Sequence, residues 1–88
     1  MINFEYDEQK SISNLSKHGI DFETAQKLWM DELHIEVKLR FDDEPRFIIV
    51  GLIDDKYWTA VITYRAGMVR IISVRRSRKT EVALYESE

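Results

Sequence analysis

Residues 46–76 read RFIIVGLIDDKYWTAVITYRAGMVRIISVRR and contain three runs rich in β-branched and aromatic residues. Strand-forming residues fill Arg46–Ile53, Tyr57–Arg65 and Met68–Arg75, and the connecting segments are three and two residues long. Connections this short join antiparallel neighbours. The stretch therefore predicts an antiparallel meander as the centre of the fold.

Two helices are expected before the meander, each started by an aspartate that can cap its first turn. The first follows Asp7 and ends at Gly19, with a narrow apolar stripe formed by Ile12 and Leu15. The second follows Asp21 and carries apolar residues at helical spacing. These residues are Phe22, Ala25, Leu28 and Trp29.

Three shorter elements complete the expected order β-α-α-β-β-β-β-α. Ile2–Tyr6 reads as a short strand, Ile35–Leu39 alternates like an outer strand with one solvated face, and Ser77–Tyr85 reads as a short helix. We therefore expect an α+β fold in one domain spanning residues 1–88. Its two N-terminal helices would pack over one face of a twisted antiparallel four-stranded meander, with the short strand and the C-terminal helix at its ends.

The two-residue loop in the meander predicts how its last two strands pair. It would place Arg65 opposite Met68, Thr63 opposite Arg70, and Trp58 opposite Arg75. Under that register, Arg75 lies on the other face of the sheet from a group of three arginines. The three are Arg65, Arg70 and Arg76.

Positive charge is concentrated in residues 65–79 of a chain whose formal net charge is −3. This segment holds six of the thirteen Lys and Arg residues and no acid. Guanidinium groups bind phosphate through paired hydrogen bonds, so the segment predicts an anion-binding surface, with nucleic acid as the commonest large anion. The alternative is that these arginines are solvated and paired with acids. The six are Arg65, Arg70, Arg75, Arg76, Arg78 and Lys79.

Two further sets of polar residues could carry chemistry. At the expected end of the first helix, His18 could transfer a proton and Lys17 could hold a phosphate, although basic residues there also complement the helix dipole. Glu44, Arg46 and Tyr64 could form an acid–base set if the sheet brings them together.

Composition excludes several other kinds of site. The absence of cysteine excludes disulfides, thiolate metal sites and cysteine nucleophiles. Two histidines sixteen residues apart, without an HExxH motif, provide no recognisable set of metal ligands. The N-terminus has no apolar signal region, and no apolar run approaches the ~20 residues of a membrane span. We expect a soluble cytoplasmic protein without a metal, a cofactor or a membrane contact.

Four blocks follow one another along the chain: FEYDEQK at 4–10, NLSKHGIDFETA at 14–25, EPRFIIVG at 44–51, and TYR…RIISVRR within 63–76. A closing helical segment from Glu81 to Tyr85 follows them. Together, and at this spacing, the blocks resemble the BrnT family over nearly the whole length. The resemblance implies a type II toxin with a RelE-like fold that cleaves RNA without a metal. It also implies neutralisation by a ribbon-helix-helix BrnA antitoxin, through which alone the complex would contact operator DNA.

The resemblance also assigns roles to individual residues. Arg65 and Arg75 are expected to bind and stabilise the scissile phosphate. Glu44 or His18 would take the proton of the attacking 2′-hydroxyl, and Tyr64 would assist the leaving group. The remaining matching or neighbouring basic residues would bind RNA: Lys17, Arg46, Arg70, Arg76, Arg78 and Lys79.

The chain departs from the family pattern just before the third block. Relatives often carry a histidine there, whereas this chain has Phe41, Asp42 and Asp43. If that histidine serves catalysis, the chain is a weak or inactive relative that acts as an antitoxin partner and co-repressor. A DNA- or RNA-binding domain without catalysis is a third possibility.

Overall fold

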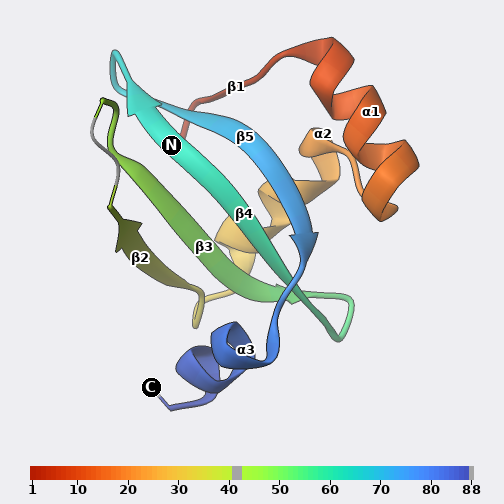
Figure 1. Cartoon of the computed structure of the whole chain (residues 1–88), viewed down its shortest axis with the longest axis vertical. Coiled ribbons are helices and arrows are strands. Elements are labelled where there is room, and N and C mark those ends of the chain that lie inside the picture. Colours follow the sequence, from red (N-terminus) through yellow and green to blue (C-terminus); the bar gives the residue numbers. More distant parts are fainter. Residues whose placement is uncertain (41–42, 88) are drawn as a thin grey trace.

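The computed structural model describes residues 1–40 and 43–87, so Phe41 and Asp42 of the departing segment lie outside the described residues. Figure 1 shows a twisted sheet with α1 beside it and α3 at one end. The elements, in chain order, are β1 (Phe4–Glu5), α1 (Glu8–His18), α2 (Phe22–Ala25), the 3₁₀ helix η1 (Gln26–Met30), β2 (Ile35–Leu39), β3 (Arg46–Ile53), β4 (Lys56–Arg65), β5 (Met68–Arg76) and α3 (Lys79–Glu86).

The α+β class is as expected, but the predicted four-stranded antiparallel sheet is wrong. Within the described residues, the sheet has five strands in the order β1-β5-β4-β3-β2, and it is mixed because β1 runs parallel to β5. The pairing joins Phe4 to Val69 and Glu5 to Arg70. Phe4 also packs edge-on against Trp29 at 4.8 Å between ring centroids, which holds β1 in place. A strand of two residues has no alternation from which this partner could be predicted.

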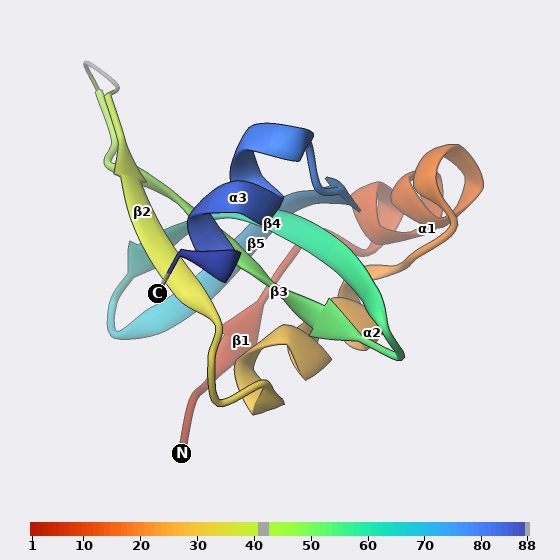
Figure 2. The ribbon, with the colours of Figure 1, turned by 90° about the horizontal axis from the view of Figure 1, so that it is seen from below.

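The prediction that the helices cover one face is also wrong, because the described helices lie on two sides of the sheet, with α2 and η1 on one side and α3 on the other. Figure 2 shows α3 on one side and α2 with the segment that follows it on the other. We call these the α3 face and the α2 face. The α2 face carries the larger core, in which Phe22 and Leu28 pack against Ile49 and Ile62. On the α3 face, Tyr85 packs with apolar residues of β3, including Val50.

Helix α1 packs with polar residues, not with the predicted stripe of Ile12 and Leu15. Those two side chains are 60% and 49% exposed, whereas Ser11 and Asn14 are buried. The Asn14 amide donates to the carbonyl of Val74 at 2.8 Å and accepts from its N–H at 3.3 Å. Beyond its short pairing with β1, β5 is an edge strand whose backbone groups need partners. Asn14 provides them, and this determines which side of α1 faces the sheet.

The caps of the first two helical segments are confirmed. Asp7 and Asp21 accept the predicted backbone hydrogen bonds, from Lys10 and Thr24. Gly19 ends α1 at φ +80°, a conformation that glycine adopts without strain. The second helix is shorter than expected, however, because its α-helical part ends after one turn and continues as η1.

A β-bulge changes the register of β4 and β5. The predicted pairs Arg65–Met68 and Thr63–Arg70 are confirmed, but the register shifts by one residue at Val61/Ile62. As a result, Trp58 lies opposite Arg76 and not opposite Arg75. The shift reverses the faces of all later residues of β5.

The C-terminal helix is tied to the sheet through Asp31. The carboxylate of Asp31 accepts from the Leu52 N–H at 2.9 Å and from the Tyr85 hydroxyl at 2.8 Å. Burial alone would raise the pKa of Asp31, but hydrogen bonds from Leu52, Leu33 and Tyr85 lower it overall. Asp31 therefore stays ionised at neutral pH and anchors α3.

The substitution Tyr85→Phe is expected to lower the free energy of unfolding by about 1 to 2 kcal/mol, because it removes a hydrogen bond to a carboxylate within a packed layer. Urea denaturation measures this. Tyr57→Phe is the matched control, since its hydroxyl donates to Glu86 on the exposed surface and should contribute less than about 0.5 kcal/mol. Equal losses in the two variants would contradict an anchor at Asp31.

Candidate nucleic-acid interface

The α3 face carries a row of polar side chains across three strands. Thr63 lies opposite Arg70, and the Thr63 hydroxyl donates to the carbonyl of Pro45, next to Arg46. Arg46 itself lies opposite Leu39, which packs with the apolar residues of the α3 face. Arg46 and Arg70 therefore flank Thr63 on this face, although they are far apart in sequence.

Strand β1 adds an acid to the end of this row. A carboxylate oxygen of Glu5 lies 3.4 Å from Nη1 of Arg70, and the two side chains are 33% and 28% exposed. That distance is long for a charge-assisted hydrogen bond, which is usually about 2.7–2.9 Å. The pair is therefore weak enough for an anionic ligand to take the place of Glu5.

Arg65 lies beyond this row, at the β4–β5 turn, and pairs with Glu44. Its Nε and Nη2 donate to the two carboxylate oxygens of Glu44 at 3.0 and 3.3 Å, but 52% of the arginine side chain is exposed. Exposed ion pairs contribute about 0–1 kcal/mol. A phosphate could therefore displace Glu44, or bind alongside it, at small cost.

Arg75 lies on the same face because of the bulge, but its ion pair is shorter and less exposed than those of Arg65 and Arg70. Both carboxylate oxygens of Glu81, on α3, accept from the Arg75 guanidinium at 2.8 Å. Glu81 also accepts from the Thr59 hydroxyl and the Arg78 N–H. Hydrogen bonding from Arg75 is the main cause that lowers the pKa of Glu81 to about 2. The same hydrogen bonding raises the pKa of Arg75. The α3 helix therefore holds Arg75 in place.

The three remaining basic residues of the 65–79 segment lie outside this group of arginines. Arg76 lies on the α2 face, where its guanidinium carbon stands 5.4 Å from the centroid of the Trp58 ring. Arg78 precedes α3 and Lys79 begins it. The predicted group of Arg65, Arg70 and Arg76 on one face is thus wrong, because the bulge exchanges Arg76 for Arg75.

The sheet does not assemble Glu44, Arg46 and Tyr64 into one set. Tyr64 lies opposite Val69 on the α2 face, and its ring contacts Phe47 at 5.1 Å between centroids. Burial, followed by a hydrogen bond to Glu36, raises the pKa of Tyr64 to about 12. The placement of Tyr64 gives no support to a role for it beside the arginines.

Lys17 and His18 lie at the exposed end of α1, next to the edge of β5. They line a groove of about 310 Å³ together with Ile72 and Ser73 of β5. Ser73 pairs with Val61, whose side chain packs on the α3 face. The groove therefore opens beside the arginine-bearing face, as a catalytic or phosphate-binding role for the two residues requires.

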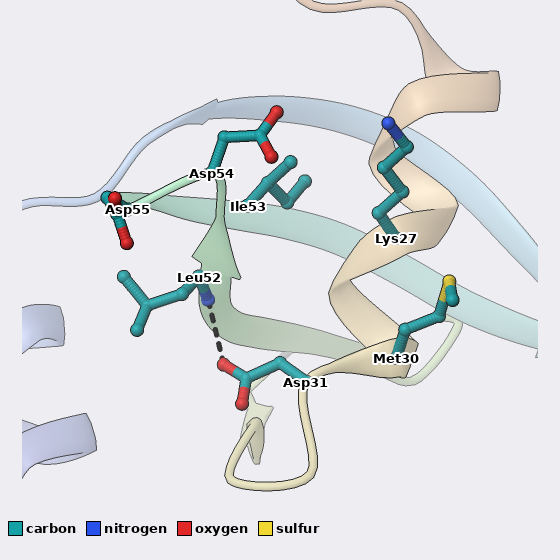
Figure 3. Close-up of a pocket in the computed structure, with 7 residues that line it drawn as sticks. All are labelled: Lys27, Met30, Asp31, Leu52, Ile53, Asp54 and Asp55. Atoms are coloured by element: carbon teal, nitrogen blue, oxygen red, sulfur yellow. Dashed lines mark hydrogen bonds between the residues drawn. The ribbon is translucent and has the colours of Figure 1, made fainter.

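Another hollow, of about 420 Å³, lies at the β3–β4 turn on the side of η1 (Figure 3). Three aspartates line it, namely Asp31, Asp54 and Asp55, together with Lys27. This charge disfavours a polyanion. Among the described residues, no three histidine or acidic side chains form a group that could hold a metal ion.

Reasoning from the sequence missed three polar residues at or beneath this surface, of which Thr63 is fully buried. Glu5 joins it through the parallel pairing of β1, for which no local signal exists. Thr63 was placed correctly opposite Arg70 but not considered as part of a site. Lys10 lines the groove at the edge of β5, and its spacing of seven residues from Lys17 is a helical repeat that could have indicated a shared side of α1.

Comparison with known proteins bears on what this surface does. No helix within residues 1–40 and 43–87 has the length and apolar character needed to span a membrane. No curated protein matches the chain. Residues 6–81 match a family model described as "Ribonuclease toxin, BrnT, of type II toxin-antitoxin system".

Proposed function

The chain belongs to the BrnT family of ribonuclease toxins of type II toxin–antitoxin systems, and we propose that it cleaves RNA, without a metal ion, on the arginine-bearing α3 face. The observation that supports this proposal is that Arg46 and Arg70 lie on either side of the buried Thr63, next to Arg65. Guanidinium groups stay protonated and match phosphate geometry, so they can stabilise charge that develops on the reacting phosphate.

In this proposal the 2′-hydroxyl of RNA attacks the adjacent phosphorus. A bond forms between the 2′-oxygen and phosphorus, and the bond to the 5′-oxygen of the next nucleotide breaks. The products are a 2′,3′-cyclic phosphate and a 5′-hydroxyl. Because the nucleophile and phosphate belong to the same substrate, positioning and charge stabilisation contribute most of the rate.

Glu44 is the proposed acceptor of the 2′-hydroxyl proton. It is a carboxylate on the arginine-bearing surface, held beside Arg65 at 2.9 Å. When a phosphate binds Arg65, Glu44 is available to accept a proton from the neighbouring 2′-hydroxyl. His18 is the alternative acceptor, reaching the site from the groove, and water protonates the leaving oxygen.

Arg75 has a different role in this proposal from the one expected from sequence. Its guanidinium is engaged by both oxygens of Glu81, so it contributes positive potential and holds α3 without binding the scissile phosphate directly. Arg65 and Arg70 have weaker partners and are the proposed phosphate ligands. Arg78 and Lys79, at the start of α3, would bind more distant phosphates.

A type II toxin has an antitoxin partner, and we propose that this one is a BrnA-like ribbon-helix-helix protein. The toxin would then contact operator DNA only through that antitoxin, consistent with the chain's net charge of −3. We further propose that the complex acts in the cytoplasm.

One observation favours a second function, that of an inactive antitoxin partner and co-repressor. The three face arginines Arg65, Arg70 and Arg75 each pair with a carboxylate in the absence of RNA. If these pairs are permanent, no arginine of the three is available for phosphate, and only the partner-binding role remains.

Purified protein should cleave single-stranded RNA in the presence of EDTA and leave a 2′,3′-cyclic phosphate, and its expression without an antitoxin should arrest growth. The cyclic end distinguishes 2′-hydroxyl attack from metal-assisted hydrolysis, which leaves a linear phosphate. Intact RNA, harmless expression and a stable complex with a ribbon-helix-helix protein would support the second function instead.

A further inference from the structure

The groove beside β5 differs in charge from two other hollows of the described residues. Seven described residues line it, and none of them is acidic. Three of the seven are lysines or histidine, namely Lys10, Lys17 and His18. The hollow at the β3–β4 turn has three aspartates, and a third hollow near β1 has Glu5 and Glu8. The groove is therefore suited to an anion where those two hollows are not.

The two lysines lie on one side of α1, on either side of its anchor to the sheet. Lys10, Asn14 and Lys17 stand at positions i, i+4 and i+7, which share one side of a helix. Asn14 is buried against Val74, so the lysines on each side of it face the same edge of β5. The anchor thus fixes how the groove presents its charge.

Helix electrostatics explain only one of these lysines. Lys17 lies in the last turn of α1, where a cation complements the helix dipole. Lys10 lies in the first turn, three residues after the cap Asp7, where the dipole disfavours a cation. The charge of Lys10 thus opposes the helix dipole, and no acid among the described lining residues of the groove compensates it. An anionic ligand in the groove would account for this placement.

The groove is continuous with the proposed cleavage surface. Ser73 lines the groove and also lies on β5 between Arg70 and Arg75. A single strand that displaces Glu5 from Arg70 can therefore continue over Ser73 into the groove, where none of the described lining residues is acidic.

We propose that this groove is a backbone subsite that binds one or two phosphates of RNA flanking the scissile bond, through Lys10 and Lys17. The inference rests on the proposed ribonuclease function and extends it by giving the path of the RNA away from the reacting phosphate. Contacts made to phosphates alone provide affinity and register but do not read the bases.

The test measures the affinity of 2′-O-methyl RNA, which cannot be cleaved, as a function of salt concentration. Each phosphate contact to a single strand contributes about 0.7 to the slope of log affinity against log salt. The double variant Lys10→Gln/Lys17→Gln should lower that slope by about 0.7 for one lost phosphate contact or about 1.4 for two, and weaken binding to different sequences equally. The matched control is Lys27→Gln/Lys38→Gln, with the same change in net charge but with Lys38 paired to Phe47 on the α2 face and Lys27 in the aspartate-lined hollow.

The outcomes separate this inference from the proposed function. If the unmodified protein fails to cleave ordinary RNA, the proposed function fails, and the slopes still report on the groove. If it cleaves RNA but both double variants keep the same slope, the subsite is wrong. A groove variant that keeps its RNA affinity but binds the antitoxin more weakly would assign the groove to the protein partner and overturn the proposal.

Discussion

The substitution Arg70→Ala is expected to lower the rate of RNA cleavage by about a hundredfold to a thousandfold, the usual effect of removing one donor that stabilises transition-state charge. Arg70 lies opposite Thr63 on the α3 face, and its ion pair with Glu5, at 3.4 Å, can yield to a phosphate. Single-turnover cleavage at saturating protein measures the effect on the chemical step. Because only 28% of the side chain is exposed, a urea denaturation curve should accompany the assay.

Arg76→Ala is the matched control for this prediction. Arg76 is on the same strand and has the same charge, but it lies over Trp58 on the α2 face. Its loss should change the cleavage rate by less than about threefold, since it affects only the long-range potential. If Arg76→Ala were as damaging as Arg70→Ala, the face assignment produced by the bulge would be wrong for the active protein.

This pair of variants also shows where prediction from sequence reached its limit. The two-residue loop correctly fixed the pairs nearest to it, including Thr63 with Arg70. Alternation alone then placed Arg76, and not Arg75, with Arg70. A bulge leaves no local mark in a run such as RIISVRR. One inserted residue was enough to change the membership of the site.

Other errors have the same origin in contacts between distant segments. Glu5 and Arg70 are 65 residues apart, and their pairing depends on a two-residue strand held by aromatic packing. Likewise, Ile12 and Leu15 look like the packing side of α1 until the unpaired backbone of Val74 is considered. The caps at Asp7 and Asp21 and the pairing at the β4–β5 turn depend on nearby residues, and these were predicted correctly.

The second large effect is expected from Glu81. Replacing it with Gln should lower the free energy of unfolding by about 2 to 4 kcal/mol, because it leaves the guanidinium of Arg75 without a charged partner at a site where their side chains are 24% and 9% exposed. Denaturation at neutral pH measures this. Glu44→Gln is the control, and its exposed pair with Arg65 should contribute less than about 1 kcal/mol.

The contribution of Glu81 should also depend on pH in a definite direction. Its pKa falls from about 4.5 in the unfolded chain to about 2 in the folded protein, mainly because Arg75 donates to it. The folded protein therefore binds fewer protons, and the stabilisation is fully present above about pH 4.5 and is lost as the pH falls towards 2. Glu81→Gln should flatten the acid side of the stability profile, leaving the smaller contributions of Asp21 and Asp31, whose pKa values are also lowered.

A double variant at Arg75 and Glu81 distinguishes a structural from a catalytic role for Arg75. If Arg75 acts by holding α3, the double variant Arg75→Met/Glu81→Gln should recover much of the stability lost by Glu81→Gln, since it removes the unpaired guanidinium while the amide oxygen of the replacement can still accept from the Thr59 hydroxyl and the Arg78 N–H. It should also retain cleavage within about tenfold, because Arg65 and Arg70 remain. A stable double variant that has lost cleavage as completely as Arg70→Ala would show instead that the guanidinium of Arg75 contacts the substrate.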